Sequence, residues 1–257
     1  MNIHWLKITD STNLDAWAGR DSEPDGTVWC AAYQRAGRGQ RGNRWESAEG
    51  ENLMFSILFK PRRMRAADQF VLSQVCAVGV ARYLKDKGAG PVLVKWPNDV
   101  YIGSRKVCGM LLENALSGDT LSVCVAGIGI NINQRTFPPE LPNPTSLLLS
   151  LEEKAGRGLE RMDVRRELDG VLEHILGLYG RIGEDGTVPG LDEEYGRMLF
   201  RLGEEAEFEE TEYFTGGQPR RFRGRILGVE KETSRLVVRH CDGRVSGYYF
   251  KEIKYIL

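Results

Sequence analysis

The chain has 257 residues, of which 41% are hydrophobic and 28% charged. This composition is ordinary for a globular protein and supplies enough apolar surface for a core, so global disorder is excluded. The formal net charge is -1. Any attraction to nucleic acid or to an anionic membrane must therefore come from a local patch.

Membrane and secretory segments are not indicated. No apolar run approaches the roughly 18 residues of a membrane helix, and residues 1–10 lack the basic start and long apolar stretch of a signal peptide. The five cysteines are odd in number and form no C-x-x-C pair. We therefore expect buried thiols in a reducing cytoplasm rather than disulfides or a zinc ribbon.

Strand-like and helix-like segments are mixed along residues 1–200, which predicts an α/β (α+β) domain. Apolar runs indicate strands before Ser11 and over residues 28–33, 53–59, 92–94, 100–102, 106–113 and 121–131. Periodicity and capping residues indicate helices over 14–19, 68–87, about 164–179 and within 190–199, after an irregular proline-rich segment at 138–144.

The composition changes at about residue 201. Short alternating runs occupy residues 205–208, 222–229, 236–239 and 247–250, and Asp242-Gly243 is a typical hairpin turn. We predict a small five-stranded barrel over residues 201–257, docked on a main domain of residues 1–200, because so short a segment buries little core alone.

A glycine- and arginine-rich loop, residues 34–45, follows the strand at 28–33. Its glycines let backbone N–H groups approach a ligand, and Arg38 offers the paired donors that suit carboxylate or phosphate. The loop could bind an anion, contact nucleic acid or only be solvated. Trp45 could stack on a purine or anchor the loop.

Two further segments carry polar groups at strand ends. In Lys-Trp-Pro-Asn-Asp, residues 95–99, Asp99 could bind Mg²⁺ beside phosphates, although such a turn is also a common structural element. Lys106 stands at the mouth of an apolar strand and faces either solvent or a cleft. Gly109 leaves one face of that strand open to a ligand.

Residues 127–133 read Gly-Ile-Gly-Ile-Asn-Ile-Asn. A third glycine and a following helix are missing, so this is not a dinucleotide-binding fingerprint. Glycines such as Gly129 instead suggest close approach of a flat ligand, and Asn131 could pair with an adenine edge. Ser11, Thr12 and Asn13 form a helix-capping cluster that could also hydrogen-bond a urea-like carbonyl.

Several enzyme classes are excluded by motif. The sequence contains neither the phosphate-binding G-x-x-x-x-G-K-[ST] loop nor a G-x-S-x-G nucleophile elbow. The three histidines, His4, His174 and His240, are far apart in the sequence and suggest no metal site.

Taken in order, the motifs resemble the biotin protein ligase (holocarboxylase synthetase) family. They are Ser-Thr-Asn, then Gln34 ahead of G-R-G-x-R-G-x-x-W, then K-W-P-N-D, R-K-x-x-G-x-L-x-E and G-I-G-I-N-I-N, and they span about residues 1–135. The resemblance implies a central mixed sheet flanked by helices, like the class II aminoacyl-tRNA synthetases, and a C-terminal SH3-like barrel. It also implies a monofunctional form, because an N-terminal DNA-binding domain is not evident.

The resemblance further implies a two-step reaction. Biotin and ATP, with Mg²⁺, would give biotinyl-5′-AMP, and the biotinyl group would pass to a lysine of a biotin carboxyl carrier domain of acetyl-CoA carboxylase or a related carboxylase. Nucleic acid and membrane would have no role, and a homodimer through sheet edges is left open.

By the same resemblance, individual residues receive roles. Lys106 would contact the biotin carboxylate and the α-phosphate, and Arg38 would hold the anionic junction. The implied binding residues are Ser11, Thr12, Asn13, Gln34, Arg38, Gly39, Gln40, Trp45, Asn98, Lys106, Gly109, Gly129 and Asn131. Ser11, Thr12 and Gln34 would bind the ureido group, whereas Asn98, Asn131 and Trp45 would lie near the adenine.

Two positions depart from the family pattern. Gln40 and Asn43 stand where many members carry arginine, and Arg41 and Arg44 could substitute for them. Two alternative functions also stay open: a lipoate or octanoyl ligase, whose pocket needs a longer apolar tunnel, and a binding module for RNA or an acidic partner.

Overall fold

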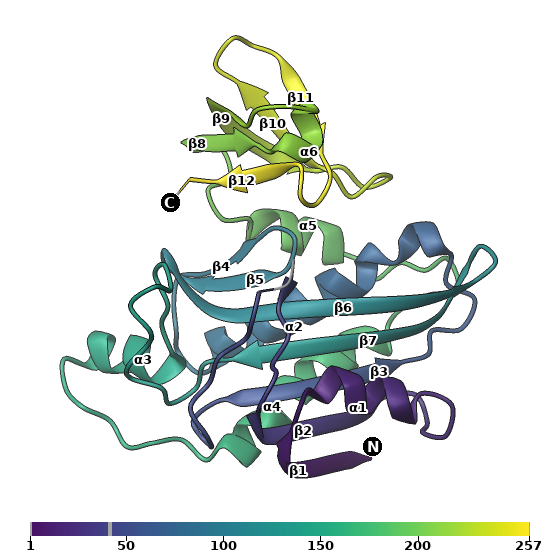
Figure 1. The fold of residues 1–257 in the computed structure, drawn as a ribbon, viewed down its shortest axis with the longest axis vertical. Coiled ribbons are helices and arrows are strands. Elements are labelled where there is room, and N and C mark those ends of the chain that lie inside the picture. Colours follow the sequence, from purple (N-terminus) through teal and green to yellow (C-terminus); the bar gives the residue numbers. More distant parts are fainter. Residues whose placement is uncertain (1, 41–42, 257) are drawn as a thin grey trace.

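The computed structural model describes residues 2–40 and 43–256 and contains two β-sheets (Figure 1). The large sheet has seven strands in the spatial order β1 (Ile3–Thr9), β2 (Thr27–Gln34), β3 (Leu53–Phe59), β7 (Thr120–Ile130), β6 (Arg105–Ser117), β5 (Asp99–Ile102) and β4 (Val92–Lys95). β1 and β2 are parallel and the other pairs are antiparallel, so the sheet is mixed, as predicted.

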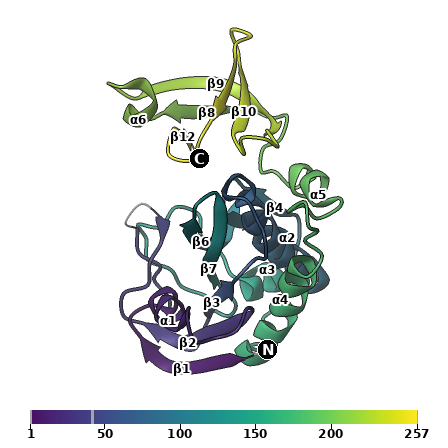
Figure 2. The same ribbon diagram turned by 90° about the vertical axis from the view of Figure 1, so that its right-hand side faces the viewer.

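Helices cover both faces of this sheet. α2 (Phe70–Asp86) and α4 (Val164–Tyr179) pack together on one face, and α1 (Thr12–Gly19) lies on the other face against β2, β3 and β7 (Figure 2). β3 is buried along its whole length because a helix covers each side of the sheet. None of the described helices has the length and hydropathy that crossing a bilayer requires.

α2 and α4 approach each other closely at Gly79. A methyl group added there would stand 2.6 Å from Cγ1 of Ile175, so a larger residue would push the helices apart. Nearby, Glu167 is buried on α4 and accepts hydrogen bonds from the Tyr83 hydroxyl at 2.5 Å and from Lys87 Nζ at 2.6 Å. These bonds satisfy a carboxylate that would be costly to bury alone.

The predicted elements are largely confirmed. Asp163 caps α4 by accepting a hydrogen bond from the Arg165 amide at 2.9 Å. Two α-helices were not predicted individually, α3 (Leu147–Ala155) and the short α6 (Glu212–Thr215). α3 begins where the Ser146 hydroxyl accepts from the Leu149 amide at 3.2 Å. Of the cysteines, Cys241 is exposed and the other four are buried, so the expectation of buried thiols fails at Cys241.

The second sheet has the order β11 (Val245–Tyr248), β10 (Leu236–His240), β9 (Arg220–Val229), β8 (Glu205–Glu210) and β12 (Ile253–Tyr255). It has the predicted number of five strands, and four of them match the predicted runs, although β11 begins two residues earlier than expected. The fifth strand, β12, was not predicted at its position. The predicted closed SH3-like barrel is not confirmed, because the strand pairing among the described residues leaves the sheet open between β11 and β12. The domain boundary at residue 200 remains a prediction.

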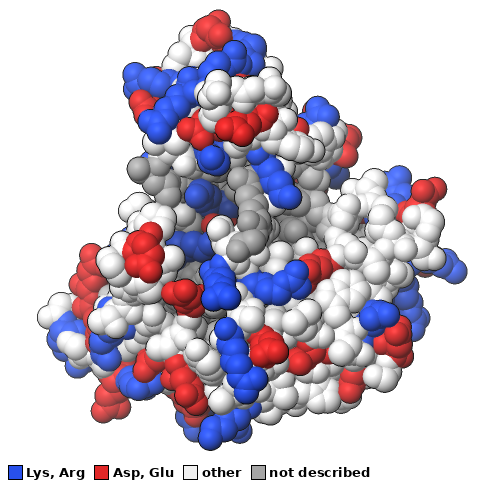
Figure 3. Space-filling view, in the orientation of Figure 1, with Lys and Arg blue, Asp and Glu red and all other residues white. Residues whose placement is uncertain are grey.

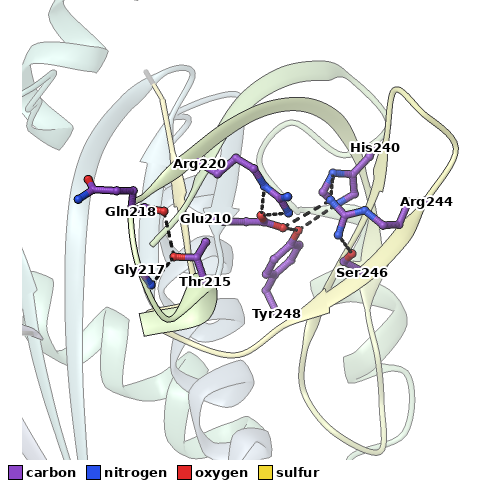
Figure 4. A network of polar contacts seen from close by, with 9 residues as sticks. All are labelled: Glu210, Thr215, Gly217, Gln218, Arg220, His240, Arg244, Ser246 and Tyr248. Carbon is purple, nitrogen blue, oxygen red and sulfur yellow. Dashed lines mark hydrogen bonds and ion pairs between the residues drawn. The ribbon is translucent and has the colours of Figure 1, made fainter. Parts of the chain in front are cut away.

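A polar network lies within the second sheet (Figure 4). The carboxylate of Glu210 is fully buried and accepts hydrogen bonds from the guanidinium of Arg220 and from the Tyr248 hydroxyl, the latter at 2.6 Å. Tyr248 donates its only hydroxyl proton to Glu210, so its oxygen must accept from His240 Nε2, 2.8 Å away. His240 Nδ1 then carries no proton and accepts from Arg244 at 2.8 Å. The network therefore holds a neutral imidazole.

The two sheets meet through the segment that includes α5 (Leu191–Arg197). The backbone of Val94 exchanges hydrogen bonds with Met198 and Phe200, at 2.7 and 2.8 Å. Arg201 then donates to the carbonyl of Ile256 at 2.9 Å, and Trp96 Nε1 donates to the carbonyl of Ser234 at 3.2 Å. These contacts place the C-terminal strand against the edge of the large sheet where β4 and β5 end.

Candidate active site

A cleft of about 690 Å³ opens between the two sheets. Its walls come from β6 and β7, the start of α1, the glycine- and arginine-rich loop, residues 95–99 and the C-terminal strand β12. Lys and Arg side chains gather around this hollow (Figure 3). An otherwise neutral chain thus concentrates positive charge at one concave site, which suits an anionic ligand.

The structure brings together nearly all residues that the sequence predicted. The cleft is lined by Ser11, Thr12, Asn13, Gln34, Arg38, Gly39, Gln40, Trp45, Asn98, Lys106, Gly109 and Gly129. Asn43 and Arg44 also line it, whereas Arg41, predicted as a substitute for a family arginine, lies outside the described residues.

Asn131 is the exception. Its side chain is buried, and its amide donates to the carbonyl of Thr145 at 2.9 Å. Asn131 follows the end of β7 and lies beside the segment at 143–147, where the backbone carbonyl of Thr145 accepts this hydrogen bond. The Asn131 amide thus supports the wall behind the cleft, and its predicted contact with an adenine edge stays a prediction.

The floor of the cleft at the start of α1 is polar. The backbone N–H and the hydroxyl of Thr12 both approach Oε1 of Gln34, at 2.8 and 3.1 Å. Gln34 Oε1 is thus committed to Thr12, and its amide group is left to donate elsewhere. Ser11 is buried at the helix start, and its hydroxyl makes no capping bond to α1.

Two of the cations that line the cleft, Lys106 and Arg38, each pair with a carboxylate. Lys106 Nζ lies 2.8 Å from Oδ1 of Asp99, and the Arg38 guanidinium lies 3.1 Å from Oε1 of Glu113. Asn98, beside this pair, turns its amide to the carbonyl of Met110 and so fixes the turn that presents Asp99. Both cations are partly exposed and can reach an incoming anion.

The indole of Trp45 lies on paired glycines of the sheet. Gly109 on β6 faces Gly129 on β7, and a methyl group added at Gly129 would stand 2.3 Å from Cε2 of the indole. At Gly109 the corresponding distance to Cζ3 is 3.0 Å. Trp45 Nε1 is buried without a hydrogen-bond partner among the described residues. The glycines therefore leave room for a flat ring on this face of the sheet, and the ring that lies there is the indole of Trp45.

Other lining residues were not predicted as site residues. Lys95 lies between the rings of Tyr101 and Tyr255, with Nζ 5.5 and 5.0 Å from their centroids. Burial lowers the pKa of Lys95. Lys254 and Tyr255 also line the cleft. Lys95 begins the K-W-P-N-D motif, which was a signal for it. The contribution of Lys254 and Tyr255 could not be read from motifs, because it depends on how the second sheet docks.

Comparison with known proteins identifies the family. Residues 5–131 match the profile of the biotin/lipoate A/B protein ligase family. The bifunctional ligase/repressor BirA of Escherichia coli is 36% identical over 179 residues, which are 69% of this chain and 54% of that protein. The biotin--[acetyl-CoA-carboxylase] ligase of Paracoccus denitrificans is 35% identical over 129 residues, 49% of this chain and 53% of that protein.

The chain thus spans about half the length of the curated relatives it matches. Among solved structures, the biotin protein ligase of Aquifex aeolicus in complex with biotin and ATP is 27% identical, with a TM-score of 0.75 and coverage of 99% of both chains. Residues 5–131 thus form a domain of the biotin/lipoate A/B protein ligase family.

Proposed function

We propose that this protein is an ATP-dependent biotin protein ligase. It joins the carboxylate of biotin to the α-phosphate of ATP, releasing pyrophosphate, and then transfers the biotinyl group from biotinyl-5′-AMP to a lysine of a carrier protein. The observation that carries the proposal is the convergence of Lys106, Arg38 and the polar floor on one cleft.

The first step must bring two anions together. A carboxylate that approaches a phosphate is repelled, and this repulsion is strong where water is excluded. Lys106 and Arg38 would offset it by shifting from Asp99 and Glu113 toward the ligand. Donors already in place cost little reorganisation when charge develops, so they lower the barrier rather than merely bind substrate.

The polar floor favours biotin over lipoate. The urea-like head of biotin has a carbonyl acceptor and two N–H donors, whereas the dithiolane of lipoate has neither. The free amide group of Gln34 and the hydroxyls of Ser11 and Thr12 supply matching partners. A lipoate ring here would leave buried polar groups unpaired, at a cost of about 1–3 kcal/mol each.

Magnesium would accompany the nucleotide. The described residues contain no cluster of three or more metal-ligating side chains, so no protein cage for a resident ion is present in that part of the chain. Asp99 is the carboxylate among the described lining residues, and Mg²⁺ usually takes only one or two carboxylates beside phosphates. Asp99 would hold the ion, which would neutralise phosphate charge.

The second step needs a lysine amine from a partner. Relatives are named biotin--[acetyl-CoA-carboxylase] ligase in Paracoccus denitrificans and Mycobacterium tuberculosis. We infer that the acceptor is the biotin carboxyl carrier domain of such a carboxylase. The amine would attack the mixed anhydride at its acyl carbon, and AMP would leave.

Thermal unfolding with each ligand tests the proposal. Biotin, ATP with Mg²⁺, and both together are added to the protein at about 100 times their dissociation constants, where one ligand stabilises by about 2.7 kcal/mol. We expect biotin to raise the unfolding temperature and lipoate at equal concentration to raise it less. Stabilisation by RNA alone, reduced steeply by salt, would instead indicate a nucleic-acid-binding module.

A further inference from the structure

Glu113, on β6 beside the cleft, joins two parts of the site that are far apart in the sequence. Its Oε1 lies 3.1 Å from the Arg38 guanidinium, and its Oε2 accepts from the amide of Asn13 at 2.8 Å. Arg38 belongs to the glycine- and arginine-rich loop, and Asn13 belongs to the start of α1. The strand therefore carries a carboxylate that both elements contact at once.

The contact with Glu113 fixes the orientation of the Asn13 amide. A carboxylate only accepts hydrogen bonds, so Asn13 must direct its NH₂ group to Glu113 and its Oδ1 to the opposite side. There Oδ1 lies 2.7 Å from the hydroxyl of the fully buried Ser56. Gly127 leaves room for this amide, since a methyl group at that position would stand 2.0 Å from Oδ1.

Ser56 connects the Asn13 amide to the residues that line the cleft. Because Asn13 Oδ1 cannot donate, Ser56 must give its proton to it. The Ser56 hydroxyl also lies 2.7 Å from the Thr12 hydroxyl. Thr12 in turn donates to Gln34 Oε1. The Asn13 amide, whose orientation Glu113 fixes, is thus connected to the polar floor through Ser56 and Thr12.

We propose that Glu113 is a positioning residue for the ligase reaction, which holds Arg38 over the cleft and fixes the Asn13 amide that is connected to the polar floor. Glu113 is not among the described residues that line the cleft, so it acts through Arg38 and Asn13. The effect of Glu113 on biotin binding rests on the proposed function. The effect of Glu113 on the position of Arg38 does not, because it is a property of the protein without substrate.

Trypsin cleavage after Arg38 measures directly how firmly Glu113 holds the Arg38 side chain. The protease must take the Arg38 side chain into its own pocket, so pairing with Glu113 competes with cleavage. We expect Glu113→Gln to accelerate cleavage after Arg38 by about two- to fivefold, the scale of a partly exposed ion pair. The matched control is Glu205→Gln, which removes a carboxylate 2.8 Å from Arg223 on the second sheet and should leave the rate unchanged.

A double-mutant cycle measures the effect of Glu113 on biotin binding. Glu113→Gln should raise the biotin dissociation constant and KM and should also lower kcat, because Arg38, which lowers the barrier, is no longer held over the cleft. In an Arg38→Ala background, Glu113→Gln should add less than its effect in the wild type. Glu113→Asp, which keeps the charge, should restore part of the lost affinity and serves if Glu113→Gln fails to fold.

The outcomes separate this inference from the proposed function. If the wild type does not bind biotin, the proposed function fails, and the trypsin comparison still decides whether Glu113 holds Arg38. Equal cleavage rates for wild type and Glu113→Gln, or full additivity with Arg38→Ala, would overturn the role assigned to Glu113.

Discussion

The ammonium of Lys106 lies 2.8 Å from the carboxylate of Asp99 on the neighbouring strand. Both residues line the cleft, on β6 and at the start of β5. Asp99 holds the cation in place, yet an ion pair that is partly exposed stabilises by only about 0–1 kcal/mol. Lys106 can therefore leave Asp99 for a substrate anion at small cost.

Replacing Lys106 by alanine tests its electrostatic role. The account expects biotin-dependent adenylate formation to fall by about 10²–10³-fold, the usual consequence of removing one such donor. Lys231→Ala, which removes an exposed lysine paired with Asp192, is the control. Wild-type turnover of Lys106→Ala, measured as pyrophosphate exchange, would remove Lys106 from the mechanism.

A methyl group on the flat surface beneath Trp45 should block the site. Gly129→Ala forces the indole away, because the new carbon would otherwise lie 2.3 Å from it. We expect biotin affinity to fall at least about tenfold, since clashes in packed regions cost typically 1–3 kcal/mol. Gly177→Ala, where no described atom lies within 4 Å of the added methyl, should bind biotin normally by titration calorimetry.

Ligand binding should change the environment of Trp45. Its Nε1 is buried without a partner among the described residues, and its ring lies on the surface that a flat ligand would use. Biotin should therefore change the tryptophan emission of the wild type, and the change should be largely absent in Trp45→Phe. An identical emission change in both proteins would place the ligand away from this indole.

Acid should weaken the second sheet through Glu210 and His240. Burial and the neighbouring Arg244 lower the pKa of His240 from its ordinary 6.5, and hydrogen bonds from Tyr248 and Arg220 outweigh burial and lower the pKa of Glu210 from 4.5. Both groups bind protons more readily when unfolded, so their stabilisation is complete above about pH 6.5 and is lost as pH falls below it.

Glu210→Gln provides the check on that prediction. At pH 7 the variant should be destabilised by about 1–3 kcal/mol, because the buried donors of the network lose a charged acceptor. The difference from wild type should shrink as the pH falls below about 4.5, the ordinary pKa of glutamate, in thermal unfolding measured at a series of pH values. A difference that stays constant with pH would show that the Glu210 charge does not support the sheet.

Much of the fold could be predicted because local patterns and burial agree. The continuous apolar run at 53–59 became the fully buried β3, and Asp163 caps α4 as expected. α3 was not predicted individually because it is short and follows a proline-rich segment, although Ser146 is a typical capping residue. Whether the second sheet closes into a barrel depends on pairing between strands that are far apart in the sequence, and composition does not reveal such pairing.

The site was predictable as a set of residues but not as a set of contacts. The motifs gave its members, although Asn131 is not among the described residues that line the cleft and its amide donates to the backbone carbonyl of Thr145. The position of Trp45 on Gly129 depends on the register of β6 and β7, and the pairing of Arg38 with Glu113 joins positions 75 residues apart. Such contacts arise from tertiary packing, which no local pattern encodes.

Exchange of labelled pyrophosphate into ATP measures acid activation itself and tests the central claim most directly. With ATP and Mg²⁺ present, the account predicts exchange when biotin is added, little when lipoate replaces it, and none without an acid. Exchange that is independent of biotin, or equal with lipoate, would contradict the assignment of this cleft to biotinyl-5′-AMP formation.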